Sequence, residues 1–375
     1  MLACQLHVLG RNPVAKSIKE FVMSKPRVLA CLLVVAFVSG LSVAQSALLD
    51  LPRQSQHAVV EQRIGITDIT INYHRPLANG RRIWGGVVPY GQVWRAGANE
   101  NTTISFSDPV TIEGKPLDKG TYGLHMIPGE TEWTVIFSKM SNAWGSFTYD
   151  EKEDALRVTV KPQATEAHDA LTYDFDQLKT DSAVATMRWD KIAVPFTVAV
   201  NVNQIVQESL HKQLRGLSQY TWEGWDDAAT YLVDNKVGLD DALKYEDESI
   251  KNEERFDNLL TKSRILDAMG RKDEAKSTLD KGLTMANSQQ LYAYGRQLQR
   301  AKKQDEAFAI YRTGYKRYPN DWLSHAGMAR IYSGQGDFDN AQKELKLSLA
   351  GAPDQQKQLI ENMLKRLESK QDINK

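Results

Sequence analysis

The feature that most constrains this chain is an alanine that recurs at nearly regular intervals through its C-terminal half. Ala242, Ala275, Ala307 and Ala341 lie 33, 32 and 34 residues apart, and each follows an acidic stretch such as Asp240-Asp241. A small residue at a fixed place in a period of roughly 34 residues is typical of paired helices that stack, because it lets two helices approach closely. The C-terminal half is therefore predicted to be a helical solenoid.

Further residues repeat with the same period, and together they resemble the tetratricopeptide repeat. A large residue follows each of the last three alanines by four positions, Gly270 and Gly336 fit the turn between helices, and Tyr332 matches an aromatic of the family. These large residues are Leu279, Tyr311 and Leu345. The resemblance implies repeats over 222–368, with 222–252 as a degenerate first unit and 203–221 as a linker helix. An irregular helical bundle is the alternative.

The segment 55–200 has a different pattern, in which apolar and polar residues alternate. Short alternating runs bounded by Gly, Pro, Asn and Asp predict an antiparallel β-sandwich. Pro195 falls inside the last run and favours an edge strand there, because proline cannot donate to a strand ladder. The runs include 69–73, 104–106, 110–112, 122–127, 133–137, 156–160, 171–175, 184–189 and 192–200. The whole chain is thus expected to be an α+β multidomain protein.

The first 44 residues are expected to be a signal peptide. Lys25 and Arg27 precede an apolar run over 28–38, and small residues follow it up to a cleavage site after Ala44, with Met23 as the preferred start. Both cysteines, Cys4 and Cys31, would then be removed, so a cysteine-free mature chain would contain no disulfide. No transmembrane segment is expected after removal, and the protein is expected to be periplasmic or secreted.

Composition and motifs exclude several functional classes. The 47 basic and 47 acidic side chains balance, which leaves no positive field for binding nucleic acid. No nucleophile elbow, zinc-protease helix or phosphate loop occurs in the sequence, so no cofactor is predicted. His74, His125 and Glu100 could meet as a metal site, but they lack local ligand spacing, and no metal is predicted either.

A long connection over 73–102 holds the densest motif of the chain. It contains Tyr-x-Arg-Pro at 73–76, Gly-Arg-x-Ile-x-Gly at 80–85 and a Val-Pro-Tyr-Gly-x-Val-Trp-Arg-x-Gly-Ala-Asn-Glu run at 88–100. With Gly-Thr-Tyr at 120–122, Trp-Gly at 144–145, Tyr-Asp at 149–150 and Arg157, this resembles the family called Domain of Unknown Function 2911. The resemblance implies a secreted, mostly-β domain and no reaction. His74 stands where the family motif is expected to have Ser.

The same connection gives the candidate ligand site. Arg95 offers a two-pronged donor, Trp94 a flat apolar surface and Glu100 an acceptor, while Asn99 and His74 lie nearby in the sequence. Such a set suits a carboxylate, a phosphate or sugar hydroxyls, and therefore a small ligand or glycan. In the alternative interpretation, Arg95 pairs internally with Glu100 or binds carbonyls of the connection, and the tryptophans belong to the core.

A row of arginines gives the candidate partner site. Arg264, Arg296 and Arg330 occupy equivalent positions 32 and 34 residues apart. In tetratricopeptide-like stacks this position lines the groove, so the row favours an acidic peptide or a chain-terminal carboxylate. A solvated face with ion pairs inside each repeat, for example to Asp267, is the alternative.

Three functions follow from these candidate sites. The first is a non-enzymatic scaffold whose repeats recruit a protein or peptide while the β-domain contacts a ligand or an envelope component. The second is an envelope hydrolase acting on glycan or peptide, with Glu100 or His125 as acid/base and Arg95 holding an anion. The third is a β-domain that only positions the repeats.

Overall fold

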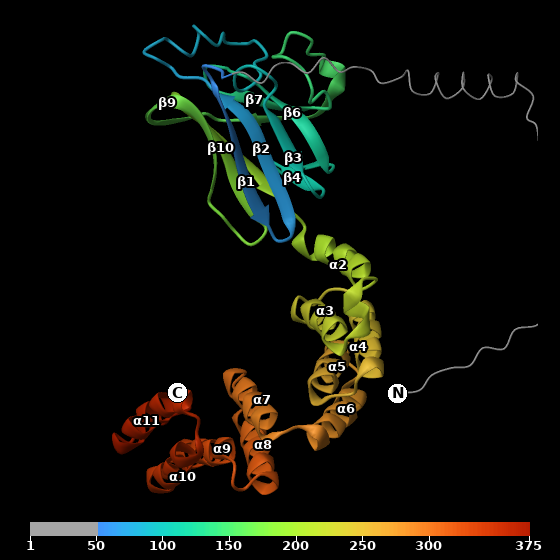
Figure 1. The fold of residues 1–375 in the computed structure, drawn as a ribbon, viewed down its shortest axis with the longest axis vertical. Coiled ribbons are helices and arrows are strands. Elements are labelled where there is room, and N and C mark those ends of the chain that lie inside the picture. Colours follow the sequence, from blue (N-terminus) through green and yellow to red (C-terminus); the bar gives the residue numbers. More distant parts are fainter. Residues whose placement is uncertain (1–51) are drawn as a thin grey trace, which may run out of the picture. The chain divides into compact units, whose positions relative to one another are not determined.

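The structure is a computed structural model that describes residues 52–375. The expected signal peptide and both cysteines, Cys4 and Cys31, lie outside the described residues. The described chain consists of a β-domain followed by a helical region (Figure 1).

Two antiparallel sheets form the β-domain, as in a sandwich. The six-stranded sheet has the order β1 (Gln56–Ile64), β2 (Thr67–Arg75), β3 (Thr103–Phe106), β6 (Gly120–Ile127), β7 (Trp133–Ser138) and β8 (Asp154–Val160). The four-stranded sheet has the order β5 (Lys115–Leu117), β4 (Val110–Ile112), β10 (Ser182–Ala199) and β9 (Gln163–Asp176). The predicted antiparallel sandwich is confirmed.

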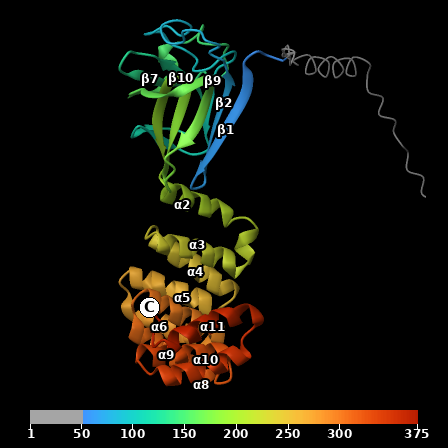
Figure 2. The same ribbon diagram turned by 90° about the vertical axis from the view of Figure 1, so that its left-hand side faces the viewer.

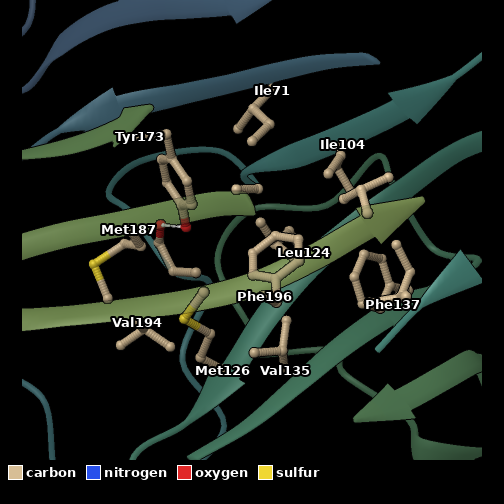
Figure 3. Close-up of a cluster of buried hydrophobic side chains, with 14 of the residues drawn as sticks. Ile71, Ile104, Leu124, Met126, Val135, Phe137, Tyr173, Met187, Val194 and Phe196 are labelled. Carbon is tan, nitrogen blue, oxygen red and sulfur yellow. Dashed lines mark hydrogen bonds between the residues drawn. The ribbon is translucent and has the colours of Figure 1, made fainter. Parts of the chain in front are cut away.

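Alternating residues of both sheets face one core. Along β2, Ile69, Ile71 and Tyr73 are buried while Asp68 and Asn72 are exposed, which is the burial pattern of a strand with one face inward. Figure 3 shows side chains of the six-stranded sheet, such as Leu124, opposite side chains of β9 and β10, such as Phe196. Burial of apolar side chains in this layer stabilises the sandwich.

One prediction about the strands is wrong. The runs 184–189 and 192–200 form a single strand, β10, which lies between β4 and β9 and is therefore not at an edge. The register of β10 with β9 ends at Ala193, and its register with β4 begins at Val198. Pro195 lies between these two paired stretches, where its lack of an N–H removes no ladder hydrogen bond.

Ten α-helices follow in the described chain, and most of them pack in pairs like tetratricopeptide repeats. They are α2 (Val202–Gln213), α3 (Trp222–Asp234), α4 (Leu239–Asn252), α5 (Phe256–Ala268), α6 (Lys272–Met285), α7 (Ser288–Arg300), α8 (Gln304–Arg317), α9 (Trp322–Gly334), α10 (Phe338–Gly351) and α11 (Asp354–Glu368). Figure 1 shows α3 with α4, α5 with α6, α7 with α8 and α9 with α10 side by side, Figure 2 shows the first two and the last of these pairings, and all four sets of partners are in contact. We call these the first to fourth helical pairs.

The repeated small residues hold the helices together. The four recurring alanines are at most 5% exposed, as expected for positions where two helices meet. Gly295 of α7 lies so close to Tyr311 of α8 that a β-carbon built there would be 2.3 Å from the ring. The predicted close approach of the helices is therefore present, and at Gly295 the two helices lie closer than an alanine would allow.

No helix among residues 52–375 has the length and apolar character needed to cross a membrane.

Candidate functional site

The long connection between β2 and β3 packs against the end of the sandwich. Trp84 is 8% exposed, and its ring centroid lies 4.8, 5.8 and 5.9 Å from those of Trp133, Trp189 and Trp94. The backbone of Trp94 pairs with Met126 of β6 through two hydrogen bonds of 2.8 Å. The indole of Trp94 thus packs on the core cluster.

This packing fixes the backbone on either side of Arg95. Ala96, the next residue, is fully buried and has a φ of 51°, a left-handed conformation that is uncommon for residues other than glycine. Its carbonyl accepts hydrogen bonds from the Tyr173 hydroxyl at 2.8 Å and from Thr102 Oγ1 at 3.1 Å. Strain of this kind persists only where the surrounding structure imposes it. Arg95 is therefore held in place by its neighbours in the chain.

The guanidinium of Arg95 is half-buried and has no anionic partner among residues 52–375. Its Nε is buried without an acceptor, and no described carboxylate lies within ion-pair distance. Burial lowers the pKa of Arg95 from its ordinary value. A positive charge removed from water normally has a partner, so Arg95 stands out among the charged groups of the β-domain.

Three residues that are far from the short segment 144–146 in the sequence meet it in the fold. A β-carbon built on Gly145 would lie 2.9 Å from Arg95 Nη1, so a larger residue would displace the guanidinium, and the φ of 71° at this position favours glycine. Glu100 forms a bridge with Trp144, and His125 Nδ1 lies 2.9 Å from Ser146 Oγ. The residues of the hydrolase alternative, Arg95, Glu100 and His125, are thus gathered around 144–146.

The imidazole of His125 is neutral at pH 7. The side chain is buried at 3% exposure, and burial lowers its pKa to about 4, an effect that the negative charge of Asp154 partly offsets. Its ring lies 5.3 Å from that of Tyr149. The Tyr149 hydroxyl donates to Asp154 Oδ2 at 2.6 Å, and burial together with this bond raises the tyrosine pKa to about 12. A linked set of polar groups therefore connects the 144–146 segment with Asp154.

The other predicted ligand residues of the connection lie beside this segment. His74 Nδ1 is 3.6 Å from Glu100 Oε2. Asn99 has a φ of 58° and its side-chain amide donates to the Ser55 carbonyl at 3.3 Å. No group of three metal-ligating side chains occurs in the described part of the chain. The ligand site on Arg95, Trp94, Asn99, Glu100 and His74 stays a prediction.

The helical region has a pocket of its own between the second and third helical pairs. Its volume is about 350 Å³, and helices α5, α6 and α7 with the start of α8 form its walls. We call it the basic crevice, because four of its six charged wall residues are basic. These residues are Arg264, Asp267, Lys272, Lys276, Lys303 and Glu306.

The three predicted partner-binding arginines lie in different surroundings. Arg264 lines the basic crevice and pairs with Asp234 of α3. Arg296 donates to Gln299 Oε1 at 3.1 Å, and burial, followed by the nearby charge of Arg330, lowers its pKa. Arg330 is only 5% exposed and donates to the Tyr292 hydroxyl at 3.0 Å. A partner site on all three arginines stays a prediction.

The last residues of the chain cover Arg330. The Ile373 carbonyl accepts a hydrogen bond from Arg330 Nη1 at 3.1 Å, and the Asn374 amide donates to the Arg330 carbonyl at 2.8 Å. Asn374 Oδ1 accepts from Gln299 Nε2 at 2.7 Å, and Asp372 Oδ1 accepts from Ser333 Oγ at 2.9 Å. We call residues 372–374 the tail.

The tail contact and the 144–146 segment were not predicted from the sequence. For the tail, the available signal is Ile373, an isolated apolar residue after α11 that is 5% exposed in the fold. For the 144–146 segment, the signal is Trp-Gly at 144–145, a motif that matters in the sequence only as part of a family resemblance.

Comparison with known families agrees with this two-part architecture. The family described as "Protein of unknown function (DUF2911)" matches residues 55–198, and the tetratricopeptide repeat matches residues 256–289. No curated protein sequence matches the chain.

Three solved structures resemble part of the chain, with low TM-scores and low sequence identity. "APC/C hetero-tetramer Cut9-Hcn1" has 11% identity and a TM-score of 0.29 over 45% of this chain and 33% of its own. A tetratricopeptide repeat protein from Parabacteroides merdae ATCC 43184 has 12% identity and a TM-score of 0.29 over 45% of this chain and 65% of its own. YrrB, "a TPR protein with an unusual peptide-binding site", has 13% identity and a TM-score of 0.26 over 46% of this chain and 88% of its own.

The chain thus spans one third of the first of these proteins and 65% of the second. Likeness of this size says nothing about the ligands of this chain. The family matches and the paired helices establish the architecture: the chain combines a DUF2911 domain with a tetratricopeptide repeat region.

Proposed function

We propose that this protein is a non-enzymatic scaffold whose basic crevice binds a short acidic segment of a partner protein, while its β-domain contacts a small ligand or an envelope component. Tetratricopeptide repeats suggest protein or peptide binding in general. The observation that supports the basic crevice as the binding site concerns the tail. The tail of this chain binds between helices of the third and fourth pairs, at the place that corresponds to the basic crevice one repeat later.

The equivalence follows from the spacing of the helices. The start of α5 and the start of α7 are 32 residues apart. The same shift relates Asp267 and Lys272 of the basic crevice to Gln299 and Gln304. Gln299 donates to Asn374 of the tail, and Gln304 lies beside Gln299. The repeats of this protein therefore accept a short chain segment at this position.

The charge of the basic crevice itself favours an acidic ligand there. At the third pair, Gln299 and Gln304 are neutral, and the tail lies on Arg330. At the second pair, four basic wall residues outnumber the two acidic ones, and Arg264 among them already pairs with Asp234. Carboxylates bind such clusters through charge-assisted hydrogen bonds.

Charge reversal in the basic crevice tests this proposal. The probe is a fluorescein-labelled peptide of alternating glutamate and isoleucine, and its affinity is measured by fluorescence polarisation. The double variant Lys272→Glu/Lys276→Glu is expected to weaken binding by at least roughly tenfold, because 1.4 kcal/mol corresponds to a factor of ten. Added salt is expected to weaken binding to the original chain in the same direction.

The matched control reverses two exposed lysines outside the crevice, Lys316 of α8 and Lys346 of α10. This variant has the same net charge as the test variant and is expected to retain binding. Equal loss in both variants would mean that only net charge matters and would overturn the proposal. A peptide with lysine in place of glutamate is expected not to bind.

We also place the protein outside the cytoplasm, as a periplasmic or secreted protein. The basic and apolar pattern of residues 25–44 supports this location. Mass spectrometry of the N-terminus of the protein expressed with its full sequence tests it. A mature chain beginning at Gln45 is expected, and an intact N-terminus would contradict the proposal.

One observation favours hydrolysis as a second candidate function. Ser146 Oγ lies 2.9 Å from His125 Nδ1, next to the guanidinium of Arg95. A hydroxyl beside a neutral imidazole is an arrangement found in nucleophilic catalysis. Labelling of the protein by a fluorophosphonate, abolished by Ser146→Ala, would support this function over the scaffold.

A further inference from the structure

The guanidinium of Arg95 and the aromatic side chains next to Gly145 form a second candidate site, separate from the basic crevice. We infer that this surface of the β-domain binds the carboxylate of a small ligand that carries a flat apolar ring. The inference specifies the ligand contact that the proposed function assigns to the β-domain. It does not depend on peptide binding by the repeats.

The first argument is the charge of Arg95. Its guanidinium is half-buried, its Nε has no acceptor, and none of the described carboxylates lies within ion-pair distance. Charged groups that leave water are normally paired, because an unpaired charge is costly. An anion that contacts the remaining guanidinium nitrogens would supply the missing interaction.

The second argument is that the site is rigid before any ligand binds. The backbone after Arg95 is held in a left-handed conformation at Ala96 by the hydroxyls of Tyr173 and Thr102. The opposite wall is fixed by the bond between His125 and Ser146 and by the backbone bond from Asn101 to the Ala143 carbonyl at 3.0 Å. A site that is already ordered loses little conformational entropy on binding.

The third argument concerns the shape of the ligand. Trp144 is 49% exposed and Phe147 is 83% exposed, and both flank Gly145. A β-carbon built on Gly145 would be 2.9 Å from Arg95 Nη1 and 3.1 Å from the Phe147 ring, so the guanidinium and this ring lie against the same glycine. Exposed aromatic rings beside a fixed donor suit a ligand with a flat apolar face.

The fourth argument selects a carboxylate over a phosphate. Arg95 supplies one positive charge, whereas Arg157, which belongs to the linked polar group of Tyr149 and Asp154, already pairs with Asp154 and Glu151. A carboxylate carries one negative charge and two oxygens that match two guanidinium N–H groups. A phosphate dianion would leave a surplus negative charge in a half-buried place, which is unfavourable.

Binding of benzoate to the full chain tests the inference. The signal is the indole N–H resonance of Trp144, assigned by Trp144→Phe, in a chain labelled with ¹⁵N-tryptophan. Benzoate is expected to shift this resonance to saturation. Benzyl alcohol, which has the ring without the charge, is expected not to shift it, and phenyl phosphate is expected to bind at least several-fold more weakly.

Variants connect the signal to Arg95. Arg95→Gln is expected to weaken benzoate binding at least tenfold, whereas Arg63→Gln, which removes an exposed arginine of the same domain that pairs with Asp68, is expected to leave it unchanged. Gly145→Ala keeps Arg95 but places a methyl group against its guanidinium, and it is also expected to weaken binding. Near-ultraviolet circular dichroism checks that each variant is folded.

Two results would overturn the inference. Unchanged benzoate binding in folded Arg95→Gln and Gly145→Ala would show that Arg95 does not hold the carboxylate. Phenyl phosphate binding as tightly as benzoate would show that the site does not select a single negative charge. Acidic-peptide binding is expected to be unaffected in both variants, so the two proposals can fail separately.

Discussion

The β-domain and the helical region are stabilised by contacts of very different sequence separation. In the β-domain, the Tyr173 N–H donates to the Tyr73 hydroxyl across 100 residues, and the Arg75 side chain donates to the Leu171 carbonyl across 96. In the helical region, contacts between neighbouring pairs such as Gln290 with Asp257 span 33 residues. A sandwich with one core must form as a whole, whereas stacked pairs depend on their nearest neighbours.

This difference also applies to the two candidate sites. The basic crevice and the tail-covered position carry different side chains although they occupy equivalent places in neighbouring repeats, because each helical pair packs mainly on the pairs beside it. The site around Gly145 depends on three parts of the β-domain together. These are β6, the long connection between β2 and β3, and the loop after β7. Three further predictions test this comparison.

The largest effect is expected from opening a cavity in the core of the β-domain. Trp133 is 2% exposed, and its ring lies 4.8 Å from that of Trp84. Trp133→Ala is expected to lower the free energy of unfolding by about 3–5 kcal/mol, the usual cost of removing a large buried aromatic. Urea unfolding followed by near-ultraviolet circular dichroism measures this loss.

The helical signal provides the test of the comparison. Far-ultraviolet circular dichroism follows the unfolding of the helices. The urea midpoint of this signal is expected to be the same in Trp133→Ala as in the original chain, because the helical pairs do not share this core. Val59→Ala, at a position that is 48% exposed, is the control and is expected to change little. A helical midpoint that moves with the β-domain would show that the two regions unfold together.

A smaller effect is expected from a buried carboxyl group in the first helical pair. Glu246 of α4 is fully buried, and burial, together with the negative charge of Asp226, raises its pKa to about 9. Because the pKa is higher in the folded than in the unfolded chain, the helical region is expected to lose stability as the pH rises from about 4.5 to about 9.

Glu246→Gln removes this dependence, since glutamine resembles the protonated acid in shape. The variant is expected to stabilise the helical region on the order of 2–3 kcal/mol at pH 7 and to have almost no effect near pH 4. Urea unfolding at both pH values measures the difference. Glu248→Gln, at an exposed position paired with Lys251, is the control, and a gain independent of pH would contradict the assignment.

The smallest effect is expected from a single methyl group between α7 and α8. Gly295→Ala would place a β-carbon 2.3 Å from the Tyr311 ring, and such overpacking costs roughly 1–3 kcal/mol. Gly314→Ala is the control, because the nearest atom to its β-carbon is 3.8 Å away and alanine is favoured over glycine in a helix by up to about 1 kcal/mol.

Comparing the two variants distinguishes the effect of packing on stability from the effect of helix propensity. Thermal unfolding is expected to show a loss of stability for Gly295→Ala and none for Gly314→Ala. Equal losses would show that the third helical pair does not depend on this close approach. The β-domain signal is expected to stay unchanged in both variants.

Local patterns were sufficient to predict the architecture. The spacing of Ala242, Ala275, Ala307 and Ala341 predicted paired helices, and the alternation along 69–73 predicted a strand with one buried face. Both patterns repeat over short distances because helices and strands have fixed periods. The prediction failed at Pro195, because whether a strand lies at an edge depends on distant strands that pair with it.

The sequence alone determined the type of each region, since each type follows from a period of a few residues or of one repeat. Only the tertiary structure decided that Arg95, Glu100 and His125 meet at 144–146, and that the tail covers Arg330. The residues that these contacts join are separated by spacings that do not recur along the chain. Their positions follow from strand register and from the packing of whole elements, which no short segment of sequence encodes by itself.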